Sequence, residues 1–200
     1  MCGFTGFVSS SAPDVNVLHA MGDTIRHRGP DDEGYFTDDH CAIAHRRLSI
    51  IDLTEGGHQP MVSADGRYVL AYNGEIYNFQ ALRAELESLG RVFTTSSDTE
   101  VLLQGYIQWG AEVTKKLRGM FAFVIWDKQE QSLYGTRDPF GIKPFYYAQM
   151  DGLFFFGSEV KSFLPHPGFK KELNQEALKF YLTFQYSALN ESFFKGAFRL

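Results

Sequence analysis

Residues 117–127 read Leu-Arg-Gly-Met-Phe-Ala-Phe-Val-Ile-Trp-Asp, and this apolar run decides the fold class. A short apolar stretch bounded by Gly119 and Asp127 is typical of a buried central strand. Other strand patterns, several of them rich in phenylalanine, occur at residues 4–8, 42–51, 67–72, 132–137, 144–149 and 153–158. Aromatic side chains suit pleated, half-buried surfaces, so the sequence predicts much β-sheet.

Helical patterns form groups of their own. Asp14 is a favourable N-cap for a helix whose apolar stripe consists of Val15, Leu18, Met21 and Ile25. Further helices are predicted at residues 79–89, 98–109, 159–164 and 174–184, the first of them capped by Asn78. Because strands follow strands instead of alternating with helices, we expect an α+β fold with mostly antiparallel sheets.

Turn signals separate these elements. Residues 27–34, His-Arg-Gly-Pro-Asp-Asp-Glu-Gly, read as a turn-rich loop. Asn73-Gly74 predicts a tight turn that ends the strand 67–72, and Asp151-Gly152 predicts a hairpin between the last two strands. The chain stops at Leu200 without a cap or a charged tail, so we expect a further domain to follow in the full-length protein.

The composition excludes several classes of protein. The 200 residues fit one domain, and a net charge of −5 does not favour nucleic acid or an anionic membrane as partner. No apolar run approaches the roughly 20 residues that span a bilayer, and the N-terminus lacks the features of a secretory signal. With Cys2 and Cys41 as the two cysteines, we expect free thiols and a cytoplasmic protein. The histidines lack metal-ligand spacing, so we expect no metal site.

Cys2 follows the initiator methionine directly and is the first candidate for chemistry. Its small side chain favours removal of Met1, which would leave a thiol and an α-amine on one residue. A free α-amine has a pKa of about 7.7–8.0, so it can serve as the base for the thiol. The alternative is an ordinary buried cysteine on the first strand.

Other polar residues have two interpretations each. Asn73 and Gly74 could form an oxyanion hole through the side-chain amide and a backbone N–H, or simply a turn. Arg46 and Arg47 lie in an apolar strand, so one should face inward, where it needs a structural carboxylate or a substrate carboxylate. Asp98 could bind an ammonium group or cap a helix.

Ordered motifs over nearly the whole chain resemble the class II glutamine amidotransferase family, within the N-terminal-nucleophile hydrolases. In sequence order they are Met-Cys-Gly at 1–3, His-Arg-Gly-Pro-Asp at 27–31, Arg-Leu-Ser-Ile-Ile-Asp at 47–52, Gln-Pro-Met at 59–61, Tyr-Asn-Gly-Glu-Ile-Tyr-Asn at 72–78, Ser-Asp-Thr-Glu at 97–100, Arg-Gly-Met-Phe-Ala-Phe at 118–123, Arg-Asp-Pro-Phe-Gly-Ile-Lys-Pro at 137–144 and Ser-Glu-Val-Lys at 158–161. The segment after Arg47 is closest to the asparagine-synthetase branch and fits the aminosugar-synthase and amidophosphoribosyltransferase branches less well.

The resemblance implies a fold, a reaction and a set of site residues. The fold would be a four-layer α-β-β-α sandwich of two antiparallel sheets. Residues 1–200 would form the glutaminase domain, which hydrolyses the glutamine side-chain amide through a Cys2 thioester. By resemblance Asn73 and Gly74 form the oxyanion hole, and the glutamine pocket is lined by Arg47, Leu48, Ile50, Asn73, Gly74, Glu75 and Asp98.

The same resemblance implies partners. The ATP-pyrophosphatase motif Ser-Gly-Gly-x-Asp-Ser is missing from these residues. We therefore expect ATP and Mg²⁺ to bind only a downstream synthetase domain that this chain lacks, and no cofactor here. That domain would use the ammonia to convert aspartate to asparagine; a homodimer is a candidate assembly. The alternatives are an N-terminal-nucleophile hydrolase that acts on another amide, and a non-catalytic glutamine-binding module.

Overall fold

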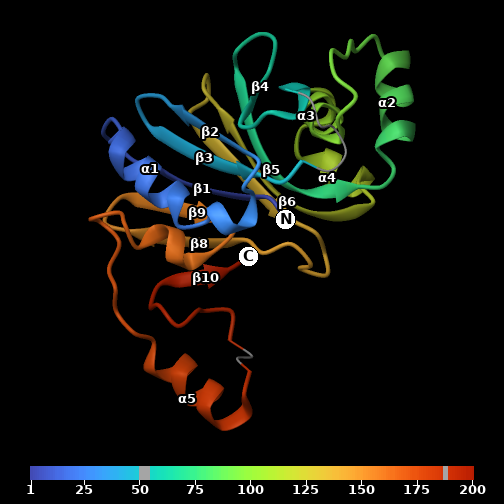
Figure 1. Ribbon diagram of the computed structural model, residues 1–200. Helices are drawn as coiled ribbons and strands as arrows, with labels where there is room; N and C mark the ends of the chain where they lie inside the picture. The colour runs from blue at the N-terminus through green and yellow to red at the C-terminus, as the bar shows by residue number, and fades with distance from the viewer. Residues whose placement is uncertain (50–54, 187–188) are drawn as a thin grey trace.

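The computed structural model describes residues 1–49, 55–186 and 189–200. Within them the chain forms two antiparallel sheets packed face to face, with helices on the outer face of each (Figure 1). This arrangement is the four-layer α-β-β-α sandwich that the resemblance predicts. None of the helices in these ranges is long and apolar enough to cross a bilayer.

The first sheet is six-stranded, in the order β10-β8-β9-β1-β3-β2. Its strands are β1 (Gly3–Val8), β2 (Asp32–Thr37), β3 (Cys41–Arg47), β8 (Tyr146–Met150), β9 (Leu153–Gly157) and β10 (Ala197–Arg199). Helix α1 (Val15–Asp23), capped by the Asp14 side chain, covers its outer face. Leu18 and Met21 of that helix pack with Phe7 and Phe155 of the sheet, so this part of the predicted apolar stripe is confirmed. Val15 is exposed instead, and Ile25 is buried but lies beyond the end of the helix.

The second sheet is four-stranded, in the order β4-β5-β6-β7. Its elements are β4 (Met61–Val62), β5 (Tyr68–Ile76), β6 (Gly119–Asp127) and β7 (Ser132–Arg137), covered by α2 (Phe79–Ser88), α3 (Asp98–Trp109) and α4 (Val113–Lys116). Short 3-10 turns lie at Arg26–Arg28, Glu55–Gly57, Gly110–Glu112 and Val160–Phe163. The strand that decides the fold class, β6, is an inner strand of this sheet, as predicted.

Alternation along β6 builds two cores at once. Phe121 and Phe123 face the helices, while Val124 and Trp126 face the other sheet. Phe4 of β1 belongs to the same inter-sheet core. Because β1 and β5 both border this core, residues at their ends are held on a rigid frame.

Several expectations for individual elements are wrong. Asn73-Gly74 makes no turn: β5 continues through it, with Asn73 opposite Ala122 and Gly74 opposite Phe121. A Cβ on Gly74 would lie 2.4 Å from the Met120 carbonyl oxygen, so glycine allows the two strands to pack closely here.

The hairpin predicted at Asp151-Gly152 does form, and both of its residues have positive φ.

Other differences concern element ends. Residues 27–34 are not all loop, because β2 begins at Asp32. The helix predicted at 159–164 is a 3-10 turn. Asn78 precedes α2 but does not cap it; its side chain instead donates to the Lys116 carbonyl at 2.9 Å and accepts from the Arg118 N–H at 2.8 Å. The Asn78 side chain thus uses both its donor and its acceptor in bonds to the backbone near α4, and makes no hydrogen bond to the N-terminus of α2.

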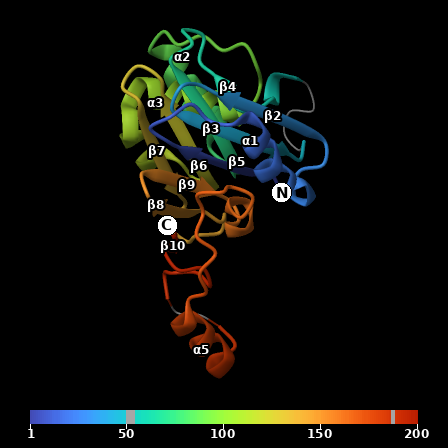
Figure 2. The same ribbon diagram turned by 90° about the vertical axis from the view of Figure 1, so that its left-hand side faces the viewer.

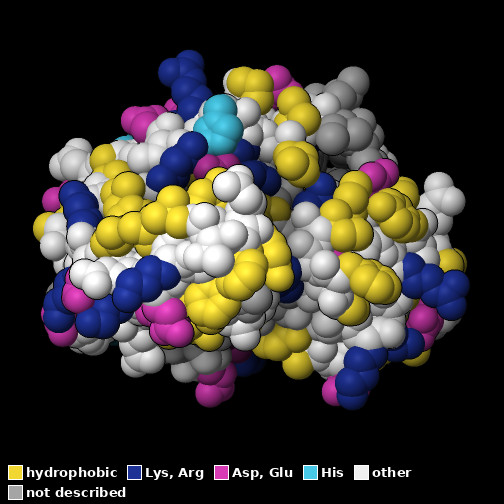
Figure 3. All heavy atoms as spheres, turned by 90° about the horizontal axis from the view of Figure 1, so that it is seen from below, with side chains coloured by type: hydrophobic (Ala, Val, Ile, Leu, Met, Phe, Trp, Pro, Cys, Tyr) yellow, Lys and Arg dark blue, Asp and Glu magenta, His cyan; other side chains and the backbone are white. Residues whose placement is uncertain are grey.

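Helix α5 (Gln175–Phe184) projects away from the sandwich, as Figures 1 and 2 show. Ala177 is its buried residue, whereas Leu182 and Phe184 are exposed. Seen from below, exposed apolar side chains are interspersed with charged ones (Figure 3). The functional pocket lies elsewhere, close to the N-terminus.

Candidate functional site

One pocket brings together most of the site residues that the sequence predicts. It is lined by Met1, Cys2, Arg47, Leu48, Gly57, Gln59, Tyr72, Asn73, Gly74, Glu75, Ser97, Asp98, Thr99, Met120 and Lys143. The residues come from the chain just before β1, the end of β3, the later part of β5 and the start of α3, with further contributions from Gly57, Gln59, Met120 and Lys143. Of the predicted set, Ile50 lies outside the described residues.

Cys2 contacts the backbone of Leu48. The Leu48 N–H donates to the Cys2 Sγ at 3.4 Å, and the thiol donates to the Leu48 carbonyl at 3.5 Å. Burial raises the pKa of the Cys2 thiol, while the Leu48 backbone, the terminal amino group, Arg47 and Lys143 act against that rise. Cys41 is fully buried in the inter-sheet core, where burial and Asp38 raise its thiol pKa well above the ordinary value. Cys2 is therefore the accessible thiol.

Asn73 places an unused donor in this pocket. Its side chain is 1% exposed. Within the parts of the chain that the structure describes, no acceptor pairs with its Nδ2. A buried amide without a partner costs about 1–3 kcal/mol, so such donors are rare in folded proteins. The arrangement provides a fixed N–H group beside Cys2 for an oxygen that arrives with a ligand.

The two neighbouring arginines of β3 leave opposite faces of the sheet, as strand alternation predicts. Arg46 bonds Asp23 at 2.5 Å and Tyr35 at 3.0 Å under α1. Arg47 lines the pocket, and its Nη1 lies 4.0 Å from the Asp32 Oδ2. Both arginines are buried, and the outer one, Arg46, lies against Gly22 and Asp23 of α1.

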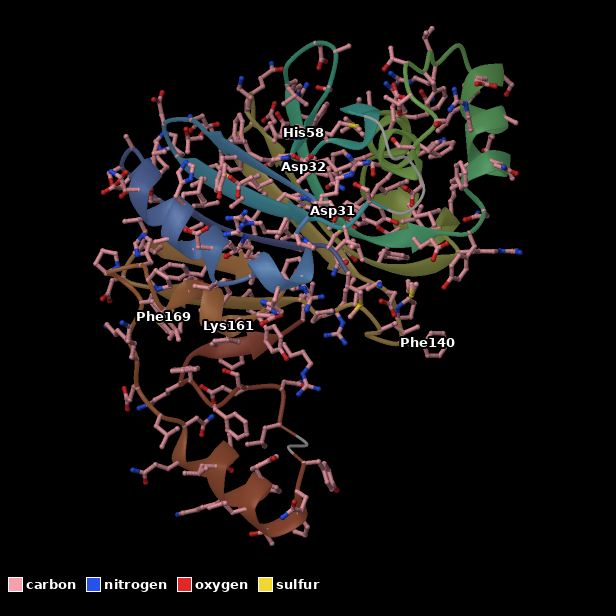
Figure 4. The ribbon with its side chains drawn as sticks, viewed as in Figure 1. Asp31, Asp32, His58, Phe140, Lys161 and Phe169 are labelled. Carbon is pink, nitrogen blue, oxygen red and sulfur yellow. The ribbon has the colours of Figure 1, made fainter. Side chains whose placement is uncertain are left out.

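The Arg47 guanidinium is packed as well as paired. A Cβ on Gly57 would lie 2.2 Å from its Nη2, so the backbone there rests against the group. His58 Nδ1 is 2.8 Å from the same Asp32 oxygen, and the two residues face each other beside Asp31 in Figure 4. This packing fixes the position of the Arg47 charge at one wall of the pocket.

Asp98 is the first residue of α3, but it does not cap the helix. Ser97 is the cap, and its Oγ accepts from the Glu100 N–H at 3.2 Å. Asp98 accepts from the Tyr72 hydroxyl at 2.8 Å and the Ile76 N–H at 3.1 Å. Burial raises the pKa of its carboxyl despite these bonds. The simple-cap interpretation is therefore wrong.

Sequence reasoning missed two basic residues near Cys2. Arg28 donates from Nε to the Cys2 carbonyl at 3.0 Å. Lys143 is 5% exposed and lines the pocket. Both lie within motifs that carry the resemblance, at 27–31 and 137–144, and that position was the available signal. His45 lies on the neighbouring strand β3 but is not among the residues that line the pocket; its Nε2 donates to the Tyr72 carbonyl, and burial lowers its pKa to about 4.

No group of three or more histidine, cysteine, aspartate or glutamate side chains within the described ranges has a metal-binding arrangement. The expected lack of a cofactor stays a prediction, because the described residues do not test it. The polar groups of the pocket instead include a thiol, an unpaired amide, two basic side chains (Arg47 and Lys143) and two acidic ones (Glu75 and Asp98).

Comparison with known proteins identifies the family. A model described as "Glutamine amidotransferase domain" matches residues 1–200. Asparagine synthetase [glutamine-hydrolyzing] 1 of Bacillus subtilis is 47% identical over 191 residues, which are 93% of this chain and 30% of the relative. A putative asparagine synthetase [glutamine-hydrolyzing] of Mycobacterium tuberculosis H37Rv is 39% identical over 221 residues, covering 100% of this chain and 34% of the relative. The chain thus spans about a third of the length of these curated relatives.

Solved structures agree on the fold. Glutamine phosphoribosylpyrophosphate amidotransferase from Bacillus subtilis superposes with a TM-score of 0.69 at 23% identity, covering 86% of this chain and 45% of that chain. An allosteric regulatory enzyme of purine biosynthesis gives 0.70 at 24% identity, covering 82% of this chain and 43% of the other. With the family model matching along its whole length, this chain belongs to the glutamine amidotransferase domain family.

Proposed function

We propose that this chain hydrolyses the side-chain amide of glutamine to glutamate and ammonia, with Cys2 as the nucleophile after removal of Met1. One observation carries the proposal: the Cys2 thiol and the unpaired Asn73 Nδ2 line the same pocket. A nucleophile beside a fixed, unused N–H donor is the arrangement that acyl transfer requires.

The charges of the pocket suit a free amino acid. Arg47 offers two parallel N–H donors to an α-carboxylate, and Asp98 offers a buried negative charge to an α-ammonium group. Leu48 and Glu75 complete the pocket walls. This pair of opposite charges favours glutamine over other amides, and over the alternative of another N-terminal-nucleophile hydrolase. We retain Ile50 in the proposed pocket by resemblance.

The reaction follows from these groups. The neutral α-amine of Cys2 accepts the thiol proton, directly or through water, and the thiolate forms a bond to the amide carbon. The electron pair of the C=O bond moves to oxygen, where Asn73 Nδ2 and the Gly74 N–H donate to it. Collapse of this intermediate breaks the C–N bond, and the α-ammonium protonates the departing amide nitrogen, which leaves as ammonia. Water then cleaves the thioester to glutamate and regenerates Cys2.

The recipient of the ammonia is a further part of the proposal. The relatives are named glutamine-hydrolysing asparagine synthetases and are about three times as long as this chain. We infer that a synthetase domain joined to this one uses the ammonia for ATP-dependent conversion of aspartate to asparagine. A cytoplasmic location and a homodimer stay predictions.

The test measures ammonia release from glutamine by protein whose Met1 has been removed. Cys2→Ala should abolish release while the circular dichroism spectrum stays unchanged. Cys41→Ala is the matched control, because Cys41 lies in the core and should be dispensable for turnover. A glutamine-analogue electrophile should modify Cys2 alone. Binding of glutamine without any release would favour the non-catalytic module instead.

A further inference from the structure

Lys143 occupies an unusual position for a lysine. It lies between β7 and β8 and is 5% exposed, although lysine side chains normally reach water. Its backbone is fixed, because the buried Asp138 carboxylate accepts from the N–H groups of Ile142 at 2.9 Å and Lys143 at 3.0 Å. Phe140, at the tip of the same loop, points away from the body in Figure 4. Lys143 instead lines the pocket that contains Cys2.

The ammonium group of Lys143 has no bonded partner in the described part of the chain. Among residues 1–49, 55–186 and 189–200, no ion pair or hydrogen bond to its Nζ is formed. Burial lowers its pKa, and the nearby charge of Arg28 acts in the same direction. The charges of Cys2, Glu75 and Asp138 act against that shift. The surroundings therefore hold an unpaired cation close enough to Cys2 and Glu75 for their charged forms to influence its pKa.

Such a charge is unfavourable for folding. The ammonium group opens only into the pocket, and restricting its contact with water without giving it a partner costs free energy that an apolar side chain of similar length would avoid. Local departures from stable packing are expected at functional sites. Because Lys143 lines the same pocket as the nucleophile, its charge can stabilise a negative species that forms there during the reaction.

We propose that the Lys143 ammonium group is a fixed positive charge that stabilises the Cys2 thiolate and the oxyanion formed when that thiolate attacks glutamine. The proposal rests on the proposed function of Cys2. Lys143 transfers no proton in this role and acts through space on the reacting atoms, in a site where burial strengthens electrostatic interactions.

The other basic groups near Cys2, which are the α-amine, Arg47 and Arg28, each have a different role. The α-amine must be neutral to accept the thiol proton, so it brings no charge until the transfer has occurred. Arg47 is assigned to the substrate carboxylate, and Arg28 bonds the Cys2 carbonyl and Glu159. The negative groups facing the pocket, Glu75 and Asp98, disfavour a thiolate. Lys143 remains as the pocket-lining cation that can offset them.

The decisive measurement is the pH dependence of Cys2 alkylation by iodoacetamide, followed by peptide mapping in Met1-free protein. Lys143→Met removes the charge but keeps the chain length. We expect the apparent pKa of the Cys2 thiol–amine pair to rise, with alkylation near pH 7 slowed about tenfold for each unit of the rise. Lys143→Arg should keep most of the wild-type profile. Lys170→Met, at an exposed lysine paired with Asp151, is the control and should change nothing.

Thermal unfolding separates this role from a structural one. Removal of an unpaired charge that has little access to water should leave the Tm of Lys143→Met equal to or above that of the wild type, while kcat for glutamine falls. A wild-type alkylation profile in Lys143→Met would overturn the proposal, and so would a lowered Tm in both Lys143→Met and Lys143→Gln. These outcomes leave the proposed function intact, whereas failure of the wild type to release ammonia would defeat that function alone.

Discussion

The Arg28 side chain holds the Cys2 backbone: its Nε donates to the Cys2 carbonyl at 3.0 Å, and its Nη1 donates to Glu159 Oε1 at 2.9 Å. A Cβ on Gly3 would lie 2.7 Å from the Arg28 Cδ, so glycine leaves room for this contact. Lys161 also bonds the Glu159 carboxylate, at 3.0 Å. The residue that carries the nucleophile is thus tied to a carboxylate more than 150 positions away in sequence.

Glu159→Gln should weaken this hold on Cys2. Burial tends to raise the Glu159 pKa, but bonds from Arg28, Lys161 and His27 outweigh it and bring the pKa below its ordinary value. The ionised form therefore stabilises the fold above the unfolded-state pKa of about 4.3, and this contribution is lost as pH falls through the lower folded-state pKa. We expect Glu159→Gln to cost about 1 kcal/mol at neutral pH and to lower kcat severalfold.

Denaturant unfolding of both proteins across a pH series checks this prediction. The difference in unfolding free energy between wild type and Glu159→Gln should shrink once the pH is below the folded-state pKa. Glu172→Gln, which removes a surface partner of Lys195, is the control and should leave kcat unchanged. A difference that stays constant from neutral to strongly acidic pH would contradict the assignment to Glu159.

Asn73→Ala should lower kcat without lowering stability much. The Asn73 Nδ2 has no partner in the described part of the chain, so truncation leaves no new unpaired acceptor. Loss of one oxyanion donor typically reduces kcat about 10²–10³-fold. Asn78→Ala is the matched control: Asn78 bridges Lys116 and Arg118, so its loss should lower Tm and spare kcat. Steady-state kinetics and thermal unfolding of the two variants distinguish these effects, and a KM change alone in Asn73→Ala would count against an oxyanion role.

Asp98→Asn should raise the KM for glutamine. The amide can still accept from Tyr72 and Ile76 but leaves the substrate ammonium unpaired, which costs about 2 kcal/mol or more, roughly 30-fold in KM. Because burial raises the Asp98 pKa, the wild-type KM should begin to rise, as pH falls, at a higher pH than for an ordinary aspartate. Arg47→Lys should also raise KM, since one ammonium cannot replace the planar fork. Unchanged KM in both variants would remove these residues from the pocket.

The fold was largely readable from short patterns, because apolar alternation and turn chemistry act locally. The strand around Phe121–Trp126 and the hairpin at Asp151-Gly152 are of this kind. Asn73-Gly74 is a case in which a local pattern gave the wrong prediction. The dipeptide favours a turn, but pairing of all nine residues of β5 with β6 keeps it in an extended strand. Register with a distant strand is a tertiary effect that a dipeptide signal does not contain.

The residues of the candidate site also fall into two groups, those that the sequence predicts and those that it does not. Cys2 and Asn73 could be selected from the sequence, because a cysteine directly after the initiator methionine and an asparagine before a glycine each indicate a possible chemical role. Lys143 and Arg28 were not selected, since a lysine and an arginine are ordinarily surface residues. Their positions within the motifs at 27–31 and 137–144 are the one signal in the sequence, and their roles follow only from the folded chain: Lys143 lines the pocket that contains Cys2, and Arg28 donates to the Cys2 carbonyl.

The last prediction concerns Met1, which lines the pocket and is 58% exposed. While Met1 is present, the nitrogen of Cys2 belongs to a peptide bond, and its lone pair is delocalised and cannot accept the thiol proton. The free α-amine then belongs to Met1 and no longer to Cys2. The Met1 side chain also lines the pocket, in space that glutamine must enter. Met1-bearing protein should therefore be folded but nearly inactive.

Activity should track the fraction of chains that have lost Met1. A single preparation can be divided and treated with methionine aminopeptidase for different times, with intact-mass spectrometry and ammonia release measured on each portion. The rate should rise in proportion to the trimmed fraction and extrapolate to near zero at full retention, with an unchanged Tm throughout. Full activity in an untrimmed portion would defeat the role of the α-amine as base. His45 would not replace it readily, because it lies outside the pocket with its Nε2 bonded to the Tyr72 carbonyl.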